Sequence, residues 1–426
     1  MRIDLAYGDG TRQLMVPSGV SIDYLTPRDI KAFDDPADAL ALALKTPIGS
    51  DSLASRLNPR SNVLIVVADP TREGTAATLP AVVDALGRMG VGAARIKVLV
   101  ARGTHRKLSP DEKKFFRSGP LATISMEEHD CDDASKLAAL LLTRRGTPVR
   151  VNRAVRKASL VILLSSVSFH YFAGFGGGRK LILPGCSDRA AILANHRLSL
   201  VDENPVRLQP GCRPGNLEGN PVHEDMCEPL GALDHLFAIN YFTDLSGRVA
   251  FVNAGDPIAS HSLACDEYES VYRVTMAERA RVVVLSSGGH PYDINLLQSH
   301  KALFQASRAT RAAGSVLFFS ECSEGVGSQS LSDALTLERD RFLAQAWKNY
   351  SLNNQTAVSL LGLTSRCQVG MVTELDAQAV RLAGITPVDN AEAFLAGALE
   401  SSGADSITVI RHGSKILPDI LGSTER

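Results

Sequence analysis

A histidine and a lysine flank a run of glycines in the stretch FHYFAGFGGGRKLILPG, residues 169–185. Backbone amides in a glycine-rich turn can bind an anion such as phosphate, and a neutral histidine can accept a proton near pH 7. We therefore expect His170 to act as a base and Lys180 to anchor a ligand in the same pocket. Four glycines would form the anion-binding turn between them: Gly174, Gly176, Gly177 and Gly178.

The residues around Lys180 exclude the commonest nucleotide-binding motifs. A Walker A loop has glycine before its lysine and a hydroxyl side chain after it, whereas Arg179 precedes Lys180 and Leu181 follows it. The stretch AGFGGGRK matches the dinucleotide motif GxGxxG only imperfectly. A phosphate-binding turn would explain the glycines, but it would leave His170 without a purpose.

Two further segments place polar side chains directly after apolar runs. In ADPTREGT, Arg72 follows Asp69 and can hold a carboxylate or phosphate through its planar fork of donors. The alternative is a helix cap beside a surface arginine. In ARGTHRKLS, the basic neighbours of His105 favour a neutral ring that can accept a proton. The alternative is an ordinary loop histidine.

Two helical segments carry the remaining candidates. His196 in AAILANHRLS has no HExxH companion, so a closed zinc site built from protein ligands alone is not supported. A packed or exposed imidazole is the alternative. In GGHPYDINLLQSHKAL, Gln298 and Lys301 share a helix face. They either face an anionic ligand or form part of a solvated surface.

Alternating strands and helices must position these candidates. Apolar, β-branched runs predict buried strands, and the stretches between several of them have helical patterns. Expected strands lie at 63–69, 95–101, 160–166, 237–242, 248–255, 281–289, 315–322 and 407–413, and expected helices at 78–90, 297–314 and 389–403. This alternation is typical of α/β proteins, which bind ligands at the carboxyl ends of their strands. We predict two α/β domains with largely parallel sheets and an active site in the cleft between them.

The expected division of the chain has three parts. Residues 1–272 would form an N-terminal catalytic and cofactor-binding domain, and residues 273–405 a C-terminal α/β domain. Residues 406–426 would form a C-terminal segment that returns to the N-terminal domain.

Composition narrows the classes of partner and compartment. The 426-residue chain has a net charge of −1, which gives no electrostatic case for binding nucleic acid or an anionic membrane. Its seven cysteines occur without a CxxC pair, a usage typical of buried thiols in a reducing compartment. The N-terminus lacks a signal-peptide core, and no apolar run approaches the roughly 18 residues that span a bilayer. We therefore expect a cytoplasmic protein.

Taken together, the motifs resemble the nickel-dependent lactate racemase family, the nickel pincer nucleotide racemases and epimerases of 2-hydroxy acids. The motifs are DPTR, GTH, HYFAGFGGGRKLILPG, NH, GNPVHEDM and LQSHK, in this order along nearly the whole chain. The resemblance implies a nickel pincer nucleotide, a pyridinium-3,5-bisthiocarboxylic acid mononucleotide derivative that binds nickel through two sulfurs and a ring carbon. Lys180 would hold it covalently through a thioamide, and His196 would be the fourth nickel ligand. Asp69 and Thr71 would contact the cofactor.

The resemblance also implies a reaction. His105 and His170 would serve opposite faces of the substrate as proton acceptors, while hydride passes to the cofactor and back through a 2-oxo acid. Arg72, Gln298 and Lys301 would hold the substrate. The implied partners are a small 2-hydroxy acid and the proteins that make and load the cofactor.

One departure from the family concerns substrate size. Leu297 stands before Gln298 where the family has a tyrosine that borders the substrate, and the only tryptophan, Trp347, cannot be matched to the family's tryptophan. We therefore expect a substrate larger than lactate, with an apolar or aromatic side chain or with a second carboxylate near His300. The alternatives are lactate itself, or a non-catalytic homologue that binds a nucleotide or anion. An NAD-dependent dehydrogenase would need a dinucleotide fingerprint, which the sequence lacks.

Overall fold

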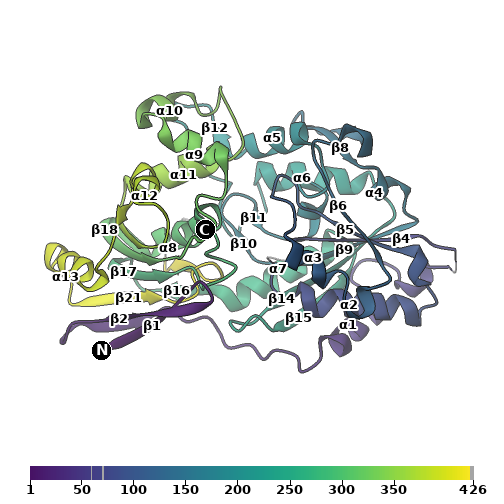
Figure 1. The fold of residues 1–426 in the computed structure, drawn as a ribbon, viewed down its shortest axis with the longest axis horizontal. Helices are drawn as coiled ribbons and strands as arrows, with labels where there is room; N and C mark the ends of the chain where they lie inside the picture. The colour runs from purple at the N-terminus through teal and green to yellow at the C-terminus, as the bar shows by residue number, and fades with distance from the viewer. Residues whose placement is uncertain (59, 70–71, 423–426) are drawn as a thin grey trace.

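The computed structural model describes residues 1–58, 60–69 and 72–422, and it has two lobes (Figure 1). The first lobe surrounds a six-stranded sheet with the order β15 (Val249–Gly255), β14 (Leu236–Thr243), β9 (Leu160–Ser166), β4 (Val63–Val67), β5 (Ile96–Val100) and β6 (Ser125–Glu128). The second lobe surrounds another, with the order β20 (Thr386–Pro387), β19 (Gln368–Val372), β18 (Thr310–Phe319), β17 (Ala280–Ser286), β21 (Ser406–Ile410) and β3 (Ser21–Tyr24).

Both sheets are largely parallel, as predicted. In the first sheet only β15 runs antiparallel to its neighbour, and every pair in the second sheet is parallel. The central strand β4 is buried along its whole length, which explains its uninterrupted apolar sequence because helices cover both faces of such a sheet.

Helices pack against each face of both sheets. On the first sheet, one apolar core includes side chains of α1 (Pro36–Lys45) and α2 (Thr75–Arg88), and the other includes side chains of α5 (Arg189–Arg197) and α6 (Pro221–Gly231). On the second sheet, one core includes α8 (Leu296–Ala309), α9 (Gln329–Thr336), α10 (Arg339–Gln345), α11 (Asn354–Thr364) and α12 (Ala377–Leu382). The opposite core includes α13 (Ala391–Ser402) and the hairpin of β1 (Arg2–Tyr7) and β2 (Gly10–Met15).

Shorter elements complete the two lobes. The remaining helices are α3 (Pro110–Phe115), α4 (Arg153–Lys157) and α7 (Ala259–Tyr272). Three antiparallel pairs are formed by β7 (Leu137–Leu142) with β8 (Pro148–Asn152), β10 (Phe169–His170) with β11 (Gly174–Phe175), and β12 (Leu200–Val201) with β13 (Arg207–Leu208). One parallel pair joins β16 (Arg273–Met276) to β22 (Leu417–Ile420).

Strand pairing differs from the expected division at both ends of the chain. β3 pairs with β21 at the edge of the second sheet, so the N-terminal residues belong to the second lobe rather than to a continuous 1–272 domain. β21 itself lies between β3 and β17, so segment 406–426 first completes the second sheet. The residues after β21 then contact the first lobe, where Leu417 joins the apolar cluster of Phe169 and Phe242 and the Tyr268 hydroxyl donates to the Lys415 carbonyl. Figure 1 shows the purple N-terminal hairpin beside the yellow β21. Pairing between strands so distant along the chain leaves no local signal in the sequence.

The expected strands are all present, but the expected helix at 297–314 is shorter. α8 ends at Ala309, where Thr310 turns extended and donates its hydroxyl to the Ala306 carbonyl at 2.9 Å. The chain then continues directly into β18.

The cysteines are free, as predicted, and all but Cys227 are buried. Across the described residues, no helix is both long and apolar enough to cross a membrane.

Candidate active site

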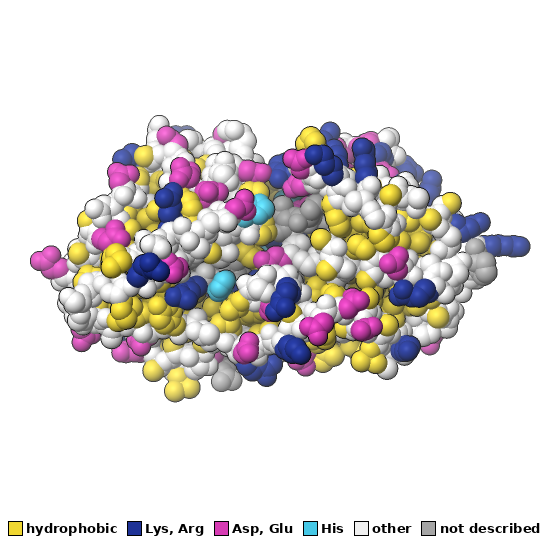
Figure 2. Space-filling view, turned by 60° about the horizontal axis from the view of Figure 1, so that its bottom comes forward, with side chains coloured by type: hydrophobic (Ala, Val, Ile, Leu, Met, Phe, Trp, Pro, Cys, Tyr) yellow, Lys and Arg dark blue, Asp and Glu magenta, His cyan; other side chains and the backbone are white. Residues whose placement is uncertain are grey.

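A cleft of about 600 Å³ lies between the lobes, where β4 and β5 end and α8 begins. The first lobe contributes Asp69, His105 and Leu108 to its lining, and the second contributes Leu297 and Gln298 among others. Figure 2 shows the two lobes with histidine side chains at the surface between them. The structure thus brings predicted site residues from both lobes to one cleft.

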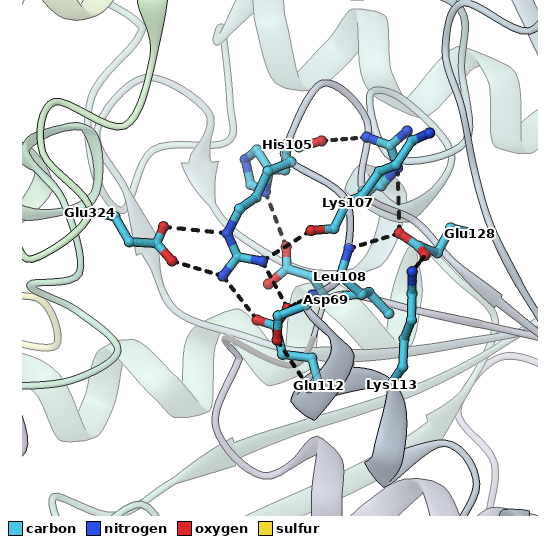
Figure 3. A network of polar contacts seen from close by, with 11 residues as sticks. Asp69, His105, Lys107, Leu108, Glu112, Lys113, Glu128 and Glu324 are labelled. Carbon is cyan, nitrogen blue, oxygen red and sulfur yellow. Dashed lines mark hydrogen bonds and ion pairs between the residues drawn. The ribbon is translucent and has the colours of Figure 1, made fainter.

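Asp69 binds His105 where strands β4 and β5 of the first sheet end. The His105 Nδ1 lies 3.0 Å from the Asp69 Oδ2, and their side chains are 43% and 11% exposed (Figure 3). A carboxylate at Nδ1 fixes the ring proton there and leaves the Nε2 lone pair to accept a proton. The predicted contact of Asp69 with a cofactor stays a prediction, and the structure adds the contact of its carboxylate with His105. The two residues follow the neighbouring parallel strands β4 and β5, a signal that appears only once the strand order is known.

His170 lies in the short β10–β11 hairpin with a different hydrogen-bond partner. The backbone amide of Ala173 donates to the His170 Nδ1 at 3.3 Å, so the neutral ring carries its proton on Nε2. Burial lowers the pKa of His170 well below its ordinary value, and Lys180 and Lys301 lower it further. His170 is therefore neutral, as predicted, but its tautomer is opposite to that of His105.

Lys180 lies in a 3₁₀ turn, Gly178–Leu181, directly after the glycines. Its Nζ is 5.3 Å from the centre of the Phe172 ring. Burial lowers the pKa of Lys180 well below its ordinary value, and the positive charges of Arg179, Lys301 and Arg72 act in the same direction. An amine with such a depressed pKa carries the lone pair needed for covalent attachment.

His196 lies near the end of α5 and has an unsatisfied ring nitrogen. Its Nδ1 is buried and has no hydrogen-bond partner among the described residues. Burial lowers its pKa to about 3, helped by Lys180 and His105. In the part of the chain that the structure describes, the only three-residue cluster with metal-ligand spacing is Asp130–Asp132, which excludes His196. A metal at His196 would therefore need donors from a cofactor, as the sequence led us to expect.

Asn195 holds α5 in place through the GNPVHEDM segment. The Asn195 Nδ2 donates to the buried Asp225 Oδ2 at 2.8 Å, and the Thr147 hydroxyl donates to the same oxygen at 2.7 Å. Asp225 therefore supports the helix that presents His196. His223, in the same segment, has its pKa lowered to about 3 by burial and by Arg179.

The glycine turn packs against the protein more closely than expected for an anion-binding loop. A Cβ on Gly174 would lie 2.1 Å from the Asn216 carbonyl oxygen, and one on Gly177 would lie 2.8 Å from the Ser166 carbonyl oxygen. Both glycines have φ of +75°, which side-chain-bearing residues rarely adopt.

Two amides of this turn are already bonded within the chain. The Gly176 amide donates to the Ser168 carbonyl and the Gly178 amide to the Ser165 hydroxyl, each at 2.7 Å. These two amides are therefore not available for the predicted anion-binding turn, and the glycines serve to bring Lys180 close to the first sheet.

The expected substrate-binding groups come from both lobes. The Lys301 Nζ donates to the Gln298 Oε1 at 2.6 Å on the shared face of α8. Burial lowers the pKa of Lys301 well below its ordinary value, and Arg72 adds to this effect. Arg72 stands just before α2, and its charge also lowers the pKa values of His170 and Lys180. Thr71, expected to contact a cofactor, lies outside the described residues.

The wall of the cleft beside Gln298 is apolar. Leu297 lines the cleft together with Leu108, Ile294 and Val326. Its backbone amide donates to the Val326 carbonyl at 3.1 Å, which fixes it against the segment after β18.

His300 and Trp347 point elsewhere. His300 is fully buried, with its Nε2 2.8 Å from the Ser359 hydroxyl, so it does not reach a second substrate carboxylate, in contrast to the expectation from the sequence. The Trp347 ring lies 5.0 Å from the guanidinium carbon of Arg197 and packs on the core of the second lobe.

Arg106 joins the two lobes at the mouth of the cleft. Its guanidinium donates to the Glu112 Oε2 at 2.8 Å in the first lobe and to the Glu324 Oε1 at 3.0 Å in the second (Figure 3). Sequence reasoning missed this bridge because its ends are far apart along the chain.

Comparisons with known proteins cover both lobes. Residues 7–207 match the family model described as the lactate racemase N-terminal domain, and residues 275–417 match the lactate racemase C-terminal domain. A lactate racemase from Thermoanaerobacterium thermosaccharolyticum is 30% identical over 294 residues, which are 68% of this chain and 67% of the relative. One from Lactiplantibacillus plantarum is 28% identical over 311 residues, 71% of each chain.

Solved structures give the same pattern. The structure of the lactate racemase apoprotein from T. thermosaccharolyticum superposes with a TM-score of 0.87 at 26% identity, covering 98% of this chain and 100% of that one. A crystal structure of a Thermotoga maritima protein superposes with a TM-score of 0.67 at 16% identity, covering 86% and 96%. This second likeness concerns the fold alone.

Proposed function

Because the chain belongs to the lactate racemase family and is therefore an isomerase, we propose that it inverts C2 of a 2-hydroxy acid larger than lactate. Its cofactor would be a nickel pincer nucleotide. The observation that carries this proposal is that His170, Lys180 and His196 gather around the Phe172 ring, at 4.6, 5.3 and 5.1 Å from its centre. The charge of Lys301 is close enough to lower the pKa values of His170 and Lys180 further.

Two side chains of the first lobe fit this cofactor. Lys180 has a depressed pKa, which suits attachment of its neutral amine through a thioamide. His196 has a buried Nδ1 without a partner among the described residues and a neutral ring, and a neutral imidazole is a good ligand for nickel. When bound, the cofactor supplies the nickel centre and a carbon that takes up and returns hydride.

Arg72, Lys301 and Gln298 would hold the substrate carboxylate and hydroxyl. The positive charge of Arg72 lowers the pKa of Lys301, and a carboxylate bound between them would supply the compensating negative charge. Arginine suits this task because its planar fork matches two carboxylate oxygens. Binding from both sides would also keep the 2-oxo acid in place while its other face is presented.

His105 and His170 would move the hydroxyl proton. Inversion needs one group to accept it on one face and another to return it on the opposite face. Asp69 supports the cationic form of His105 once Nε2 has accepted a proton. His170 has a strongly depressed pKa, so its protonated form would give up a proton readily. The reverse reaction exchanges these tasks.

The apolar wall of the cleft supports a larger substrate. Leu297, Leu108, Ile294 and Val326 offer an apolar surface to a side chain at C3. A hydrophobic wall distinguishes substrates that differ by one methylene by only roughly 1–3 kcal/mol. We therefore expect the protein to prefer the larger substrate without excluding lactate. With His300 buried in α8, an apolar or aromatic substrate such as phenyllactate is favoured over a dicarboxylate such as malate.

The proposal includes a cellular setting. Cytoplasmic cofactor-loading proteins would be its partners, and the free, buried cysteines fit a reducing compartment. The experiment that tests the function is a chiral screen of single-enantiomer 2-hydroxy acids with cofactor-loaded protein. The alternative of a non-catalytic nucleotide-binding protein predicts cofactor retention without appearance of the opposite enantiomer from any of them.

A further inference from the structure

Glu73 and Lys415 form an ion pair that joins the two lobes. The Lys415 Nζ lies 2.6 Å from the Glu73 Oε2, and the Lys415 and Glu73 side chains are only 5% and 20% exposed. Glu73 directly follows Arg72 in the first lobe, and Lys415 lies between β21 and β22 in the second. The pair therefore connects the substrate-binding side of the first lobe to the second lobe.

Thr243 closes a ring of hydrogen bonds around this pair. The Lys415 ammonium donates to the Thr243 hydroxyl at 3.0 Å, which in turn donates to the Glu73 Oε2 at 2.8 Å. A further donor of Lys415 binds the Asp244 carbonyl at 2.5 Å. All three donors of the ammonium are thus used, and the pair has one defined geometry.

Lys415 is itself fixed to the loop that leads into α8. The Gly413 and Ser414 amides donate to the Ser286 and Ser287 carbonyls at 2.9 and 3.2 Å. The Lys415 Nζ lies 5.7 Å from the centre of the Tyr292 ring, which belongs to the same loop. The connection therefore begins at Arg72 and passes through the Glu73–Lys415 pair. It ends at the loop before α8, the helix that carries the expected substrate-binding side chains of the second lobe.

The pair differs in kind from the bridge that Arg106 forms between the lobes. Arg106 and Glu324 have side chains 45% and 39% exposed, so water and salt screen their attraction. Glu73 and Lys415 are largely shielded, and removing one of them would leave the other charge uncompensated. The buried pair is therefore suited to set the spacing between the lobes beside Arg72.

We propose that Glu73 and Lys415 are positioning residues for substrate binding, which fix the Arg72 guanidinium at its working distance from Lys301. This inference rests on the proposed function, because it assigns Arg72 and Lys301 to the same carboxylate. Neither Glu73 nor Lys415 contacts the substrate in this account. They affect substrate binding by fixing the position of one lobe relative to the other.

The test uses Lys415→Met, Glu73→Gln and the double variant in cofactor-loaded protein. Each single substitution should raise KM for the preferred 2-hydroxy acid roughly tenfold, the scale expected within one coupled network, with a smaller change in kcat. The double variant should be no worse than the worse single variant. Calorimetric titration of unloaded protein with sodium phenyllactate gives a readout independent of activity, and its dissociation constant should rise in parallel.

Asp419→Asn provides a matched control in the same C-terminal segment. Asp419 pairs with Arg273 at 3.6 Å with a similarly low exposure, 17%, and Arg273 keeps Glu269 as a partner at 2.6 Å. This variant should lower the unfolding temperature without changing KM. In an Arg72→Lys background, Lys415→Met should cause little further rise in KM, because the group it positions is already altered.

Three outcomes would overturn the inference. An unchanged KM and dissociation constant in the Lys415 and Glu73 variants, with wild-type turnover intact, would refute the positioning role alone. Equal effects of Lys415→Met in wild-type and Arg72→Lys backgrounds would show that it does not act through Arg72. Absence of both binding and turnover in the unmodified protein would overturn the proposed function and this inference together.

Discussion

The His105 Nδ1 and the Asp69 Oδ2 are 3.0 Å apart at the ends of two neighbouring strands. This contact sets the tautomer of His105 and gives its protonated form a compensating charge. The Asp69 carboxylate should therefore contribute to every turnover that uses His105 as a proton acceptor.

We expect Asp69→Asn to lower kcat/KM by roughly 10²-fold or more, within the range that general acid–base catalysis contributes. The amide can favour the wrong tautomer and cannot stabilise the imidazolium. Because enantiomers have equal free energies, kcat/KM must fall equally for both. Glu112→Gln is the control, because Glu112 lines the same cleft and binds Arg106 but not His105. A variant as active as the control would remove Asp69 from proton transfer.

Lys180→Met should abolish the covalent cofactor adduct, measured as the intact mass of protein from a host that makes the cofactor. The neighbouring Arg179 cannot take over the attachment, because a guanidinium does not form a thioamide as an amine does. Retention of the full mass adduct would refute the assignment of Lys180.

The same variant tests the depressed pKa of Lys180 in unloaded protein. Folding keeps this amine neutral at pH values where the unfolded chain would protonate it, so the group destabilises the fold below its ordinary pKa of 10.5. Lys180→Met should therefore raise the unfolding temperature at neutral pH. The gain should shrink as the pH rises toward 10.5, and a gain independent of pH would contradict this cause.

His196→Ala should lose bound nickel while leaving the lysine adduct intact. Removal of a metal ligand or its support commonly lowers affinity or activity by roughly 10- to 100-fold or more. Metal analysis of the purified variant, beside its intact mass, separates the two effects. Full nickel content with normal turnover would exclude His196 as the ligand.

Leu297→Tyr should narrow the cleft and shift the preference toward lactate. The larger ring would occupy space next to Leu108 and Val326, so kcat/KM for phenyllactate should fall more than that for lactate. The expected change in their ratio is roughly tenfold, within the 1–3 kcal/mol available to an apolar wall. An unchanged ratio of kcat/KM for the two substrates, or a wild-type enzyme that already prefers lactate, would show that other side chains determine substrate size.

The fold could be predicted from the sequence where burial leaves a local pattern. β4 and β9 are apolar along most of their length because both faces of their sheet are covered, and this pattern identified them as buried strands. The pairing of β3 with β21 joins the two ends of the chain, and neither segment's sequence indicates which strand it pairs with. For the same reason the expected boundaries at residues 272 and 406 did not show that β3 and β21 belong to the second sheet.

The candidate site could be predicted where residue type and spacing were enough. His105, His170, Lys180 and His196 came from such motifs, and the shared helix face of Gln298 and Lys301 is confirmed by their hydrogen bond. The contact of Asp69 with His105 depends on strand order, and that of Glu73 with Lys415 depends on how the lobes meet. Both are properties of the folded chain that local sequence does not record.

The central claim is inversion at C2 by hydride transfer, and a labelled substrate tests it most directly. Cofactor-loaded protein is incubated with a single enantiomer of phenyllactate carrying deuterium at C2, and each enantiomer is then analysed for its label. We expect the opposite enantiomer to form and to keep deuterium at C2. Loss of the label to solvent would indicate proton abstraction instead, and failure of the opposite enantiomer to appear from any 2-hydroxy acid would contradict the account altogether.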